Sequence, residues 1–85
     1  MLRGTVDPIQ NEVITIVAAI TKAPVASIGP ETDLRLDLNV DSLQGLQIVA
    51  ALENHFGLQL ADDDLDATTS VREIVAALHR VRAQA

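Results

Sequence analysis

The chain has 85 residues, with six basic and twelve acidic side chains and a formal net charge of −6. A chain of this length buries only a thin core, which disfavours an enzyme with several catalytic residues, and its charge would repel nucleic acid and anionic membranes. It contains no cysteine, which excludes disulfides, zinc–thiolate sites and a thiol nucleophile of its own.

The apolar pattern extends over most of the sequence, so we expect one domain over residues 1–85 with an ordered core over about 7–82. The N-terminal residues include no long apolar segment. No apolar run approaches the ~18 residues needed to cross a bilayer. We therefore expect a cytoplasmic protein without membrane insertion.

The first predicted helix begins at Pro8, because an acidic cap at Asp7 followed by proline is a helix-start signal. It should run to Lys22 and end before Pro24. Its apolar residues recur at helical spacing and comprise Ile9, Val13, Ile16, Val17 and Ile20.

A long loop is predicted between Pro24 and Val40, where two prolines, Gly29 and an acidic stretch interrupt any periodicity. Loops of this length in compact domains tend to be functional. Apolar residues that we expect to anchor the loop are Ile28, Leu34, Leu36 and Leu38.

The second helix should run from Ser42 to Phe56. Asp41 can cap it, Gln44 can complete a capping box, and Gly57 suits a left-handed C-terminal cap.

A single helical turn is expected around Ala61 to Leu65. Ser70 and Glu73 then form a capping box for a last helix, whose core positions are Val71, Ile74, Val75, Leu78 and Val81 or Arg82. The sequence therefore predicts an all-α fold: a small four-helix bundle of three longer helices and one short one, with a long loop between the first two.

The second helix has two apolar faces on a helical wheel. Gly45, Ile48, Val49, Leu52 and Phe56 form the face expected in the core. Leu43, Leu46 and Ala50 lie roughly 130° away, beside Gln47, Glu53 and Asn54. A neighbouring loop could cover this second face; otherwise it is a docking surface beside Ser42.

These residues together resemble the acyl carrier proteins. The resemblance centres on Asp41-Ser42-Leu43 and extends from the first helix to the last. The flanking matches are Asp33-Leu34, Asp37-Leu38, Ala51-Leu52-Glu53, Phe56-Gly57 and Thr69.

The resemblance implies that a phosphopantetheinyl transferase attaches 4′-phosphopantetheine from coenzyme A to Ser42, with Asp41 as cap and motif residue. The arm would carry acyl groups as thioesters in fatty acid, specialised lipid or polyketide biosynthesis. No catalytic residue and no metal site are expected. The expected partners of this monomer are the transferase and acyl-transfer or synthase enzymes with basic docking patches, and the expected docking residues are Leu43, Leu46, Gln47, Ala50 and Glu53.

Three positions differ from the family pattern. Asn39 stands where glycine is usual, and Gln44 and Gln47 stand where carriers of primary fatty acid synthesis are often acidic. These differences favour a carrier for a dedicated lipid or polyketide pathway. The acid at position 41 resembles acyl carriers more than peptidyl or aminoacyl carriers, which remain an alternative.

Two further alternatives start from other features. A four-helix adaptor without a prosthetic group could bind a partner through Leu43 and Leu46. A calcium-binding loop is suggested by Asp62, Asp64 and Asp66 with Ser70 and Glu73, but the glycine that its sharp turn needs is replaced by Ala67. His55 and His79 are expected on polar faces.

Overall fold

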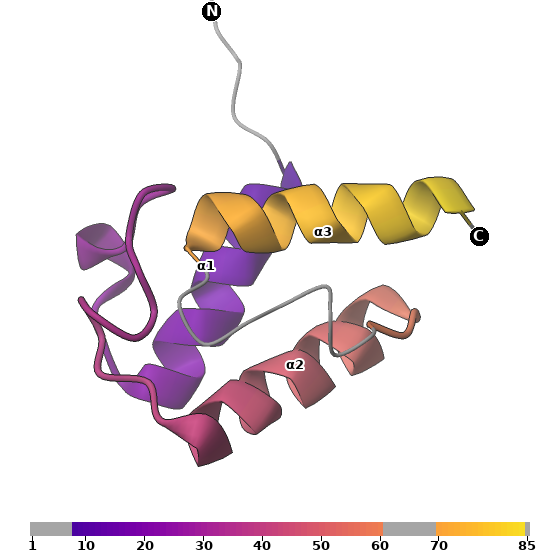
Figure 1. Ribbon diagram of the computed structural model, residues 1–85. Coiled ribbons are helices and arrows are strands. Elements are labelled where there is room, and N and C mark those ends of the chain that lie inside the picture. Colours follow the sequence, from indigo (N-terminus) through magenta and orange to yellow (C-terminus); the bar gives the residue numbers. More distant parts are fainter. Residues whose placement is uncertain (1–7, 61–69, 85) are drawn as a thin grey trace, which may run out of the picture.

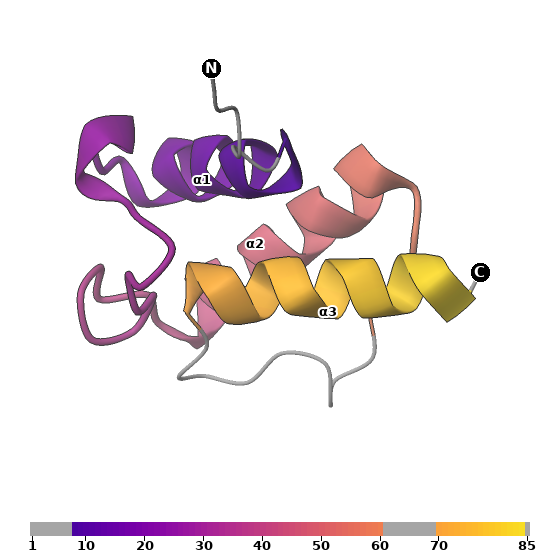
Figure 2. The ribbon, with the colours of Figure 1, turned by 90° about the horizontal axis from the view of Figure 1, so that it is seen from above.

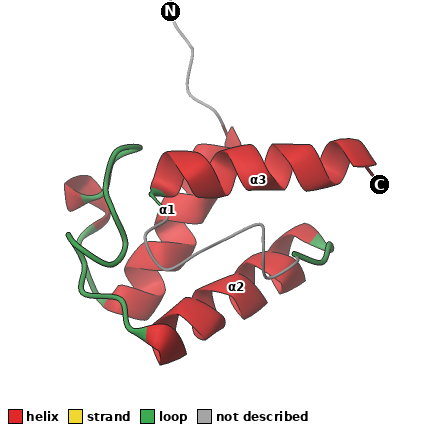
Figure 3. Ribbon diagram, in the orientation of Figure 1, coloured by secondary structure: helices red, strands yellow, loops and turns green. Residues whose placement is uncertain are grey.

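The computed structural model describes residues 8–60 and 70–84. Within these ranges it contains three α-helices, α1 (Pro8–Thr21), α2 (Ser42–Phe56) and α3 (Val71–Gln84), and one turn of 3-10 helix, η1 (Val25–Ser27). The all-α class is confirmed for these residues (Figure 3). The short helix predicted around Ala61 to Leu65 lies outside the described residues, so the count of four helices stays a prediction.

Helix α1 packs against both α2 and α3. Figures 1 and 2 show α3 running across α1, and α2 lying oblique to both. The largest of the almost completely buried side chains come from all three helices: Val13, Val17, Ile48, Leu52, Val71, Ile74 and Leu78. Because every one is Val, Ile or Leu, the centre of the core is aliphatic.

Helix α1 ends one residue earlier than predicted, at Thr21. Lys22 has a left-handed backbone with φ 66°, and its amide donates to the carbonyl oxygen of Ala18 at 2.9 Å. This closes the helix as a C-terminal cap usually does, although glycine is the common residue there. Because no glycine marks this position, the end of the helix was predicted one residue too late.

The loop between α1 and α2 contains η1 and two buried anchors, Ile28 and Leu34. Leu38 is partly buried, but Leu36 is 76% exposed, so its prediction as an anchor was wrong. The amide of Asp37 donates to the carbonyl oxygen of Asp33 in one helix-like turn. In such a turn residues four apart share a side and residues two apart do not, which separates Leu36 from its neighbours.

Helix α2 has the predicted bounds, and its C-terminal cap Gly57 has the expected left-handed conformation with φ 65°. The predicted capping box at α3 is also present. The amide of Ser70 donates to Oε1 of Glu73 at 3.0 Å, and the amide of Glu73 donates to Oγ of Ser70 at 3.3 Å. Both ends were predicted correctly because each depends on residues close together in sequence.

Candidate functional site

Asp41 fixes the start of α2. Its backbone is extended (φ −93°, ψ −177°), and its Oδ1 accepts a hydrogen bond from the amide of Gln44 at 2.8 Å. Its carbonyl oxygen accepts from the amide of Gly45 at 2.8 Å. The predicted cap is confirmed, but the return bond from the Gln44 side chain is not formed among the described residues. Among the residues that the structure describes, Oδ1 of Asp41 is the side-chain cap of this end.

Ser42 is the first residue of α2, and its side chain is exposed. Within residues 8–60 and 70–84 its hydroxyl has no hydrogen-bond partner, and the amides of Ser42 and Leu43 have no acceptor. A helix start with unpaired amides carries a partial positive charge and tolerates a phosphate. The geometry at Ser42 therefore fits a phosphodiester on its oxygen.

The loop that leads to Ser42 is held by its own carboxylates. Oδ1 of Asp33 accepts from the amides of Arg35 and Leu36 at 2.9 and 2.8 Å. Oδ2 of Asp37 accepts from the amide of Asp33 at 2.8 Å. These reciprocal bonds give the segment before α2 a defined turn, and they explain why Asp33 and Asp37 occur at this spacing.

Asn39 accounts for one departure from the family pattern. Its φ is 56°, in the left-handed region that glycine adopts without strain and that asparagine adopts more often than most other residues. Its amide donates to the carbonyl oxygen of Arg35 at 3.1 Å, and the amide of Val40 donates to that of Leu34 at 2.9 Å. Asparagine thus supports the backbone conformation that glycine would otherwise provide.

The same loop is bonded to the start of α3. The amide of Val71 donates to the carbonyl oxygen of Thr32 at 3.1 Å, and that of Arg72 donates to Pro30 at 2.9 Å. An ion pair between Arg72 and Glu31 lies beside these bonds. Sequence reasoning missed this connection, because the bonds join backbone groups far apart in the chain.

The outward face of α2 is open, as the wheel predicted. Leu43 is 65% exposed, Leu46 is 68% exposed, and Ala50 and Gln47 are also exposed. Leu52 on the opposite side is fully buried. We call Leu43, Leu46, Gln47 and Ala50 the α2 outer face; no segment of the described residues covers its apolar members.

Two residues expected in the core lie at its margin. Val49 and Gly45 are only partly buried, whereas Ile48 and Leu52 form the buried centre of α2. A wheel gives the direction of a side chain but not the depth of the packing that it meets. Val49 was therefore wrongly placed in the core, and Leu52 is the proper core reference for this helix.

Glu53, predicted as a docking residue, has a contact within the chain. It is partly buried, and its Oε2 accepts from the amide of Leu60 at 2.9 Å. Its carbonyl oxygen accepts from the amides of Gly57 and Leu58 at 2.9 and 3.2 Å. Glu53 thus closes the chain reversal after α2, a contact that the wheel could not indicate.

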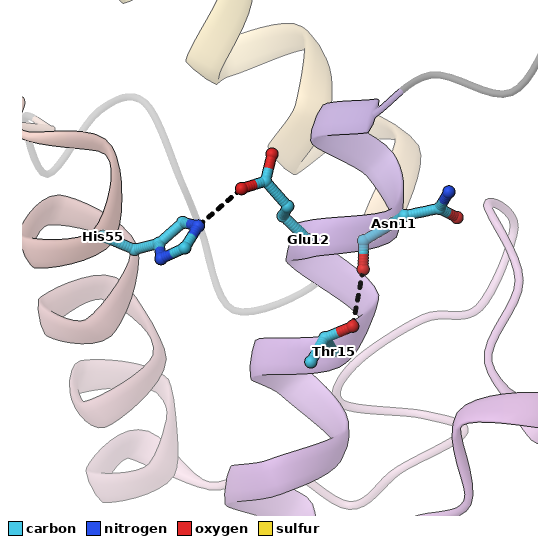
Figure 4. Close-up of polar contacts among 4 residues, drawn as sticks. All are labelled: Asn11, Glu12, Thr15 and His55. Carbon is cyan, nitrogen blue, oxygen red and sulfur yellow. Dashed lines mark hydrogen bonds and ion pairs between the residues drawn. The ribbon is translucent and has the colours of Figure 1, made fainter.

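His55 is exposed, as predicted, but its Nε2 lies 2.6 Å from Oε1 of Glu12 on α1. Figure 4 shows the two side chains pointing toward each other between the helices. They line a shallow groove of about 180 Å³ with Asn11, Thr15 and Ile16. Along α2, His55 is about 20 Å from Ser42 at 1.5 Å per residue, so it is not a base for the serine.

The described residues meet neither the requirements of a metal site nor those of a membrane-spanning helix. They contain no group of three His, Cys, Asp or Glu side chains that could hold a metal ion. The aspartates of the suggested calcium loop lie outside them, and Ser70 and Glu73 bond to each other as caps. None of the helices over 8–60 and 70–84 is long and apolar enough to cross a membrane.

Comparison with known proteins identifies the family. The family described as "Phosphopantetheine attachment site" matches residues 11–78. An acyl carrier protein of Streptomyces coelicolor is 38% identical over 63 residues, which are 74% of this chain and 68% of the relative. Acyl carrier protein 2 of Pseudomonas aeruginosa is 35% identical over 69 residues, 81% of this chain and 87% of the relative.

A third relative is named for a biosynthetic system. The polyketide-8 synthase acyl carrier protein 2 of Streptomyces avermitilis is 37% identical over 57 residues, 67% of this chain and 66% of the relative. Together these matches show a non-catalytic carrier for acyl biosynthesis whose prosthetic group is 4′-phosphopantetheine. Such a carrier interacts with a phosphopantetheinyl transferase and with acyl-transfer or synthase enzymes. The chain belongs to the acyl carrier protein family of phosphopantetheine-binding domains.

Proposed function

We propose that Ser42 is the residue that carries the 4′-phosphopantetheine arm. The observation that carries this proposal is the exposed, unpartnered hydroxyl of Ser42 on the first turn of α2, within the described part of the chain. The arm supplies a thiol, which this cysteine-free chain lacks. The phosphopantetheine group attaches through a hydroxyl, and Ser42 offers one in a position that an enzyme can reach.

Ser42 and its neighbours have different roles in accepting the phosphopantetheine group. Oγ of Ser42 forms the bond to phosphorus while the pyrophosphate P–O bond of coenzyme A breaks and its adenosine bisphosphate leaves. Asp41 keeps the helix start in place, and the amides of Ser42 and Leu43 offset the phosphodiester charge. We assign removal of the hydroxyl proton to the transferase; His55, which lies at the far end of α2 and is bonded to Glu12, is too distant to take it.

The decisive experiment compares intact masses after treatment with coenzyme A and a broad-specificity phosphopantetheinyl transferase. The wild-type chain should gain one phosphopantetheine group, and Ser42→Ala should gain none. Circular dichroism should show that Ser42→Ala is folded, because Asp41 provides the cap. An unmodified wild-type chain beside a fully converted control carrier would overturn the proposal and favour an adaptor without a prosthetic group.

We further propose that the α2 outer face is the surface by which partner enzymes recognise the carrier. Its exposed leucines lie within one to four residues of Ser42, so a partner that covers them also reaches the hydroxyl. The net charge of −6 supports partners with basic patches, which would attract the carrier from a distance. Glu53 stays a predicted member at the edge of this surface.

A charged side chain tests whether the face is a contact surface. Leu46→Glu should remain folded and slow the transfer of phosphopantetheine, because Leu46 is exposed in the free protein. Leu52→Glu is the matched control on the same helix; it buries a charge at a fully buried position and should unfold the domain. Unfolding of Leu46→Glu, or an unchanged transfer rate in the folded variant, would remove Leu46 from the proposed surface.

The remaining proposals concern the setting of the carrier. We propose one monomeric carrier domain over residues 1–85, located in the cytoplasm and serving a dedicated lipid or polyketide pathway. The neutral Gln44 and Gln47 on α2 support such a pathway, as does similarity to a relative named for a polyketide synthase. The mass of the acyl group on protein purified from its native cell would identify the pathway class.

A further inference from the structure

Every acidic side chain in residues 8–60 and 70–84 already has a partner inside the molecule. Some cap a helix or hold a loop amide, and others pair with a basic side chain. Two carboxylates contact basic side chains: Glu12 contacts His55, and Glu31 contacts Arg72. The others accept from backbone amides: Asp33 from Arg35 and Leu36, Asp37 from Asp33, Asp41 from Gln44, Glu53 from Leu60, and Glu73 from Ser70. These carboxylates therefore maintain the fold.

The α2 outer face, in contrast, has no charge. From Ser42 to Leu52 the helix contains no acidic or basic residue. Its outward side chains are the exposed Leu43, Leu46, Gln47 and Ala50, and Asn54 extends the same exposed face. Two leucines each about two-thirds exposed beside neutral amides form a small apolar patch with hydrogen-bonding groups at its edge.

We propose that the phosphopantetheinyl transferase contacts the α2 outer face with an uncharged surface, apolar opposite Leu43 and Leu46 and hydrogen-bonding opposite Gln47. The inference rests on the proposed attachment at Ser42 and on docking through α2. A basic patch placed against this face would meet carboxylates only at its edges, where Asp41 and Glu53 already accept from amides of this chain, and would lose its hydration with little compensation. The negative charge of the carrier then speeds its encounter with the transferase, and burial of Leu43 and Leu46 stabilises the complex.

Two glutamines of the chain provide a matched test. Gln47 lies on the α2 outer face, and Gln59 is an exposed residue beyond the C-terminal cap Gly57. Gln47→Glu and Gln59→Glu change the net charge by the same amount, so any effect on long-range attraction is common to both. A difference between them reports the contact itself.

The rate constant kcat/KM for the carrier is measured with one transferase and coenzyme A at about 50 and 500 mM NaCl, where screening differs strongly. Gln47→Glu should lower kcat/KM about tenfold relative to Gln59→Glu at both salt concentrations, because the cost of burying a charge is not removed by screening. Circular dichroism confirms that both variants are folded.

Two results would overturn the inference. If Gln47→Glu were faster than Gln59→Glu at low salt and this advantage faded at high salt, the transferase would present basic residues to the face. Equal rates for the two variants at both salt concentrations would show that Gln47 is outside the contact. Failure of the proposed function is a separate result: the wild-type chain would gain no mass at Ser42, and both proposals would fall together.

Discussion

The starts of α2 and α3 use similar capping residues in different surroundings. At α2, Asp41 caps the first turn, and the amides of Ser42 and Leu43 have no acceptor among the described residues. At α3, the caps are joined by two loop carbonyls, which accept from the amides of Val71 and Arg72. The comparison shows that a capped helix start can either be left open for chemistry or be used to hold a distant segment.

The largest expected effect on stability comes from placing an aspartate at the first residue of α2 or of α3. Val71→Asp buries an unpaired charge and should cost several kcal/mol, a large share of the ~5–10 kcal/mol of a small domain. Ser42→Asp should change the free energy of unfolding by less than about 0.5 kcal/mol, because an exposed negative charge is tolerated at a helix start. Urea unfolding measures both. Comparable losses would show that the start of α2 is as closed as that of α3.

The next effect separates the two caps. Asp41→Ala should lower stability by about 1 kcal/mol, or about 4–8 °C in Tm, and Asp41→Asn should restore most of it. Ser70→Ala should lose less than Asp41→Ala, because loop carbonyls still hold the first amides of α3. Thermal melts followed by circular dichroism give the order. A larger loss in Ser70→Ala would mean that the loop carbonyls do not support α3.

The smallest effect concerns the ion pair beside the loop carbonyls. Both Arg72 and Glu31 are largely exposed, so Arg72→Gln should cost no more than about 0.5 kcal/mol. The backbone amide of Arg72 is retained in this variant and continues to donate to Pro30. Chemical unfolding at low and high salt measures the change. A loss above about 1 kcal/mol would indicate that the side-chain pair, and not the backbone, holds the loop.

The sequence predicted the parts of the fold whose causes are local. The bounds of α2 follow from Asp41 and Gly57, and the start of α3 from Ser70 and Glu73, because each cap bonds to residues at most four positions away. The exposure of Leu46 followed from helical periodicity. The attachment role of Ser42 came from resemblance, since an Asp-Ser pair alone is only a helix start.

What could not be predicted depends on contacts between distant segments. No local pattern indicates that Glu53 bonds to Leu60, that His55 meets Glu12, or that the loop bonds to α3. The partial burial of Val49 likewise depends on how closely the neighbouring segments approach α2. These features are set by tertiary packing, which a single helical wheel does not contain.

The bonds between the loop and α3 provide an internal reporter of loop position. The amide hydrogens of Val71 and Arg72 are protected by carbonyl oxygens of Thr32 and Pro30, and no residue within α3 can replace those acceptors. Their exchange with deuterium therefore requires the loop to move away from α3, whereas exchange later in α3 requires the helix itself to open. Two amides far from Ser42 in sequence thus record how often the segment leading to the attachment site leaves its place.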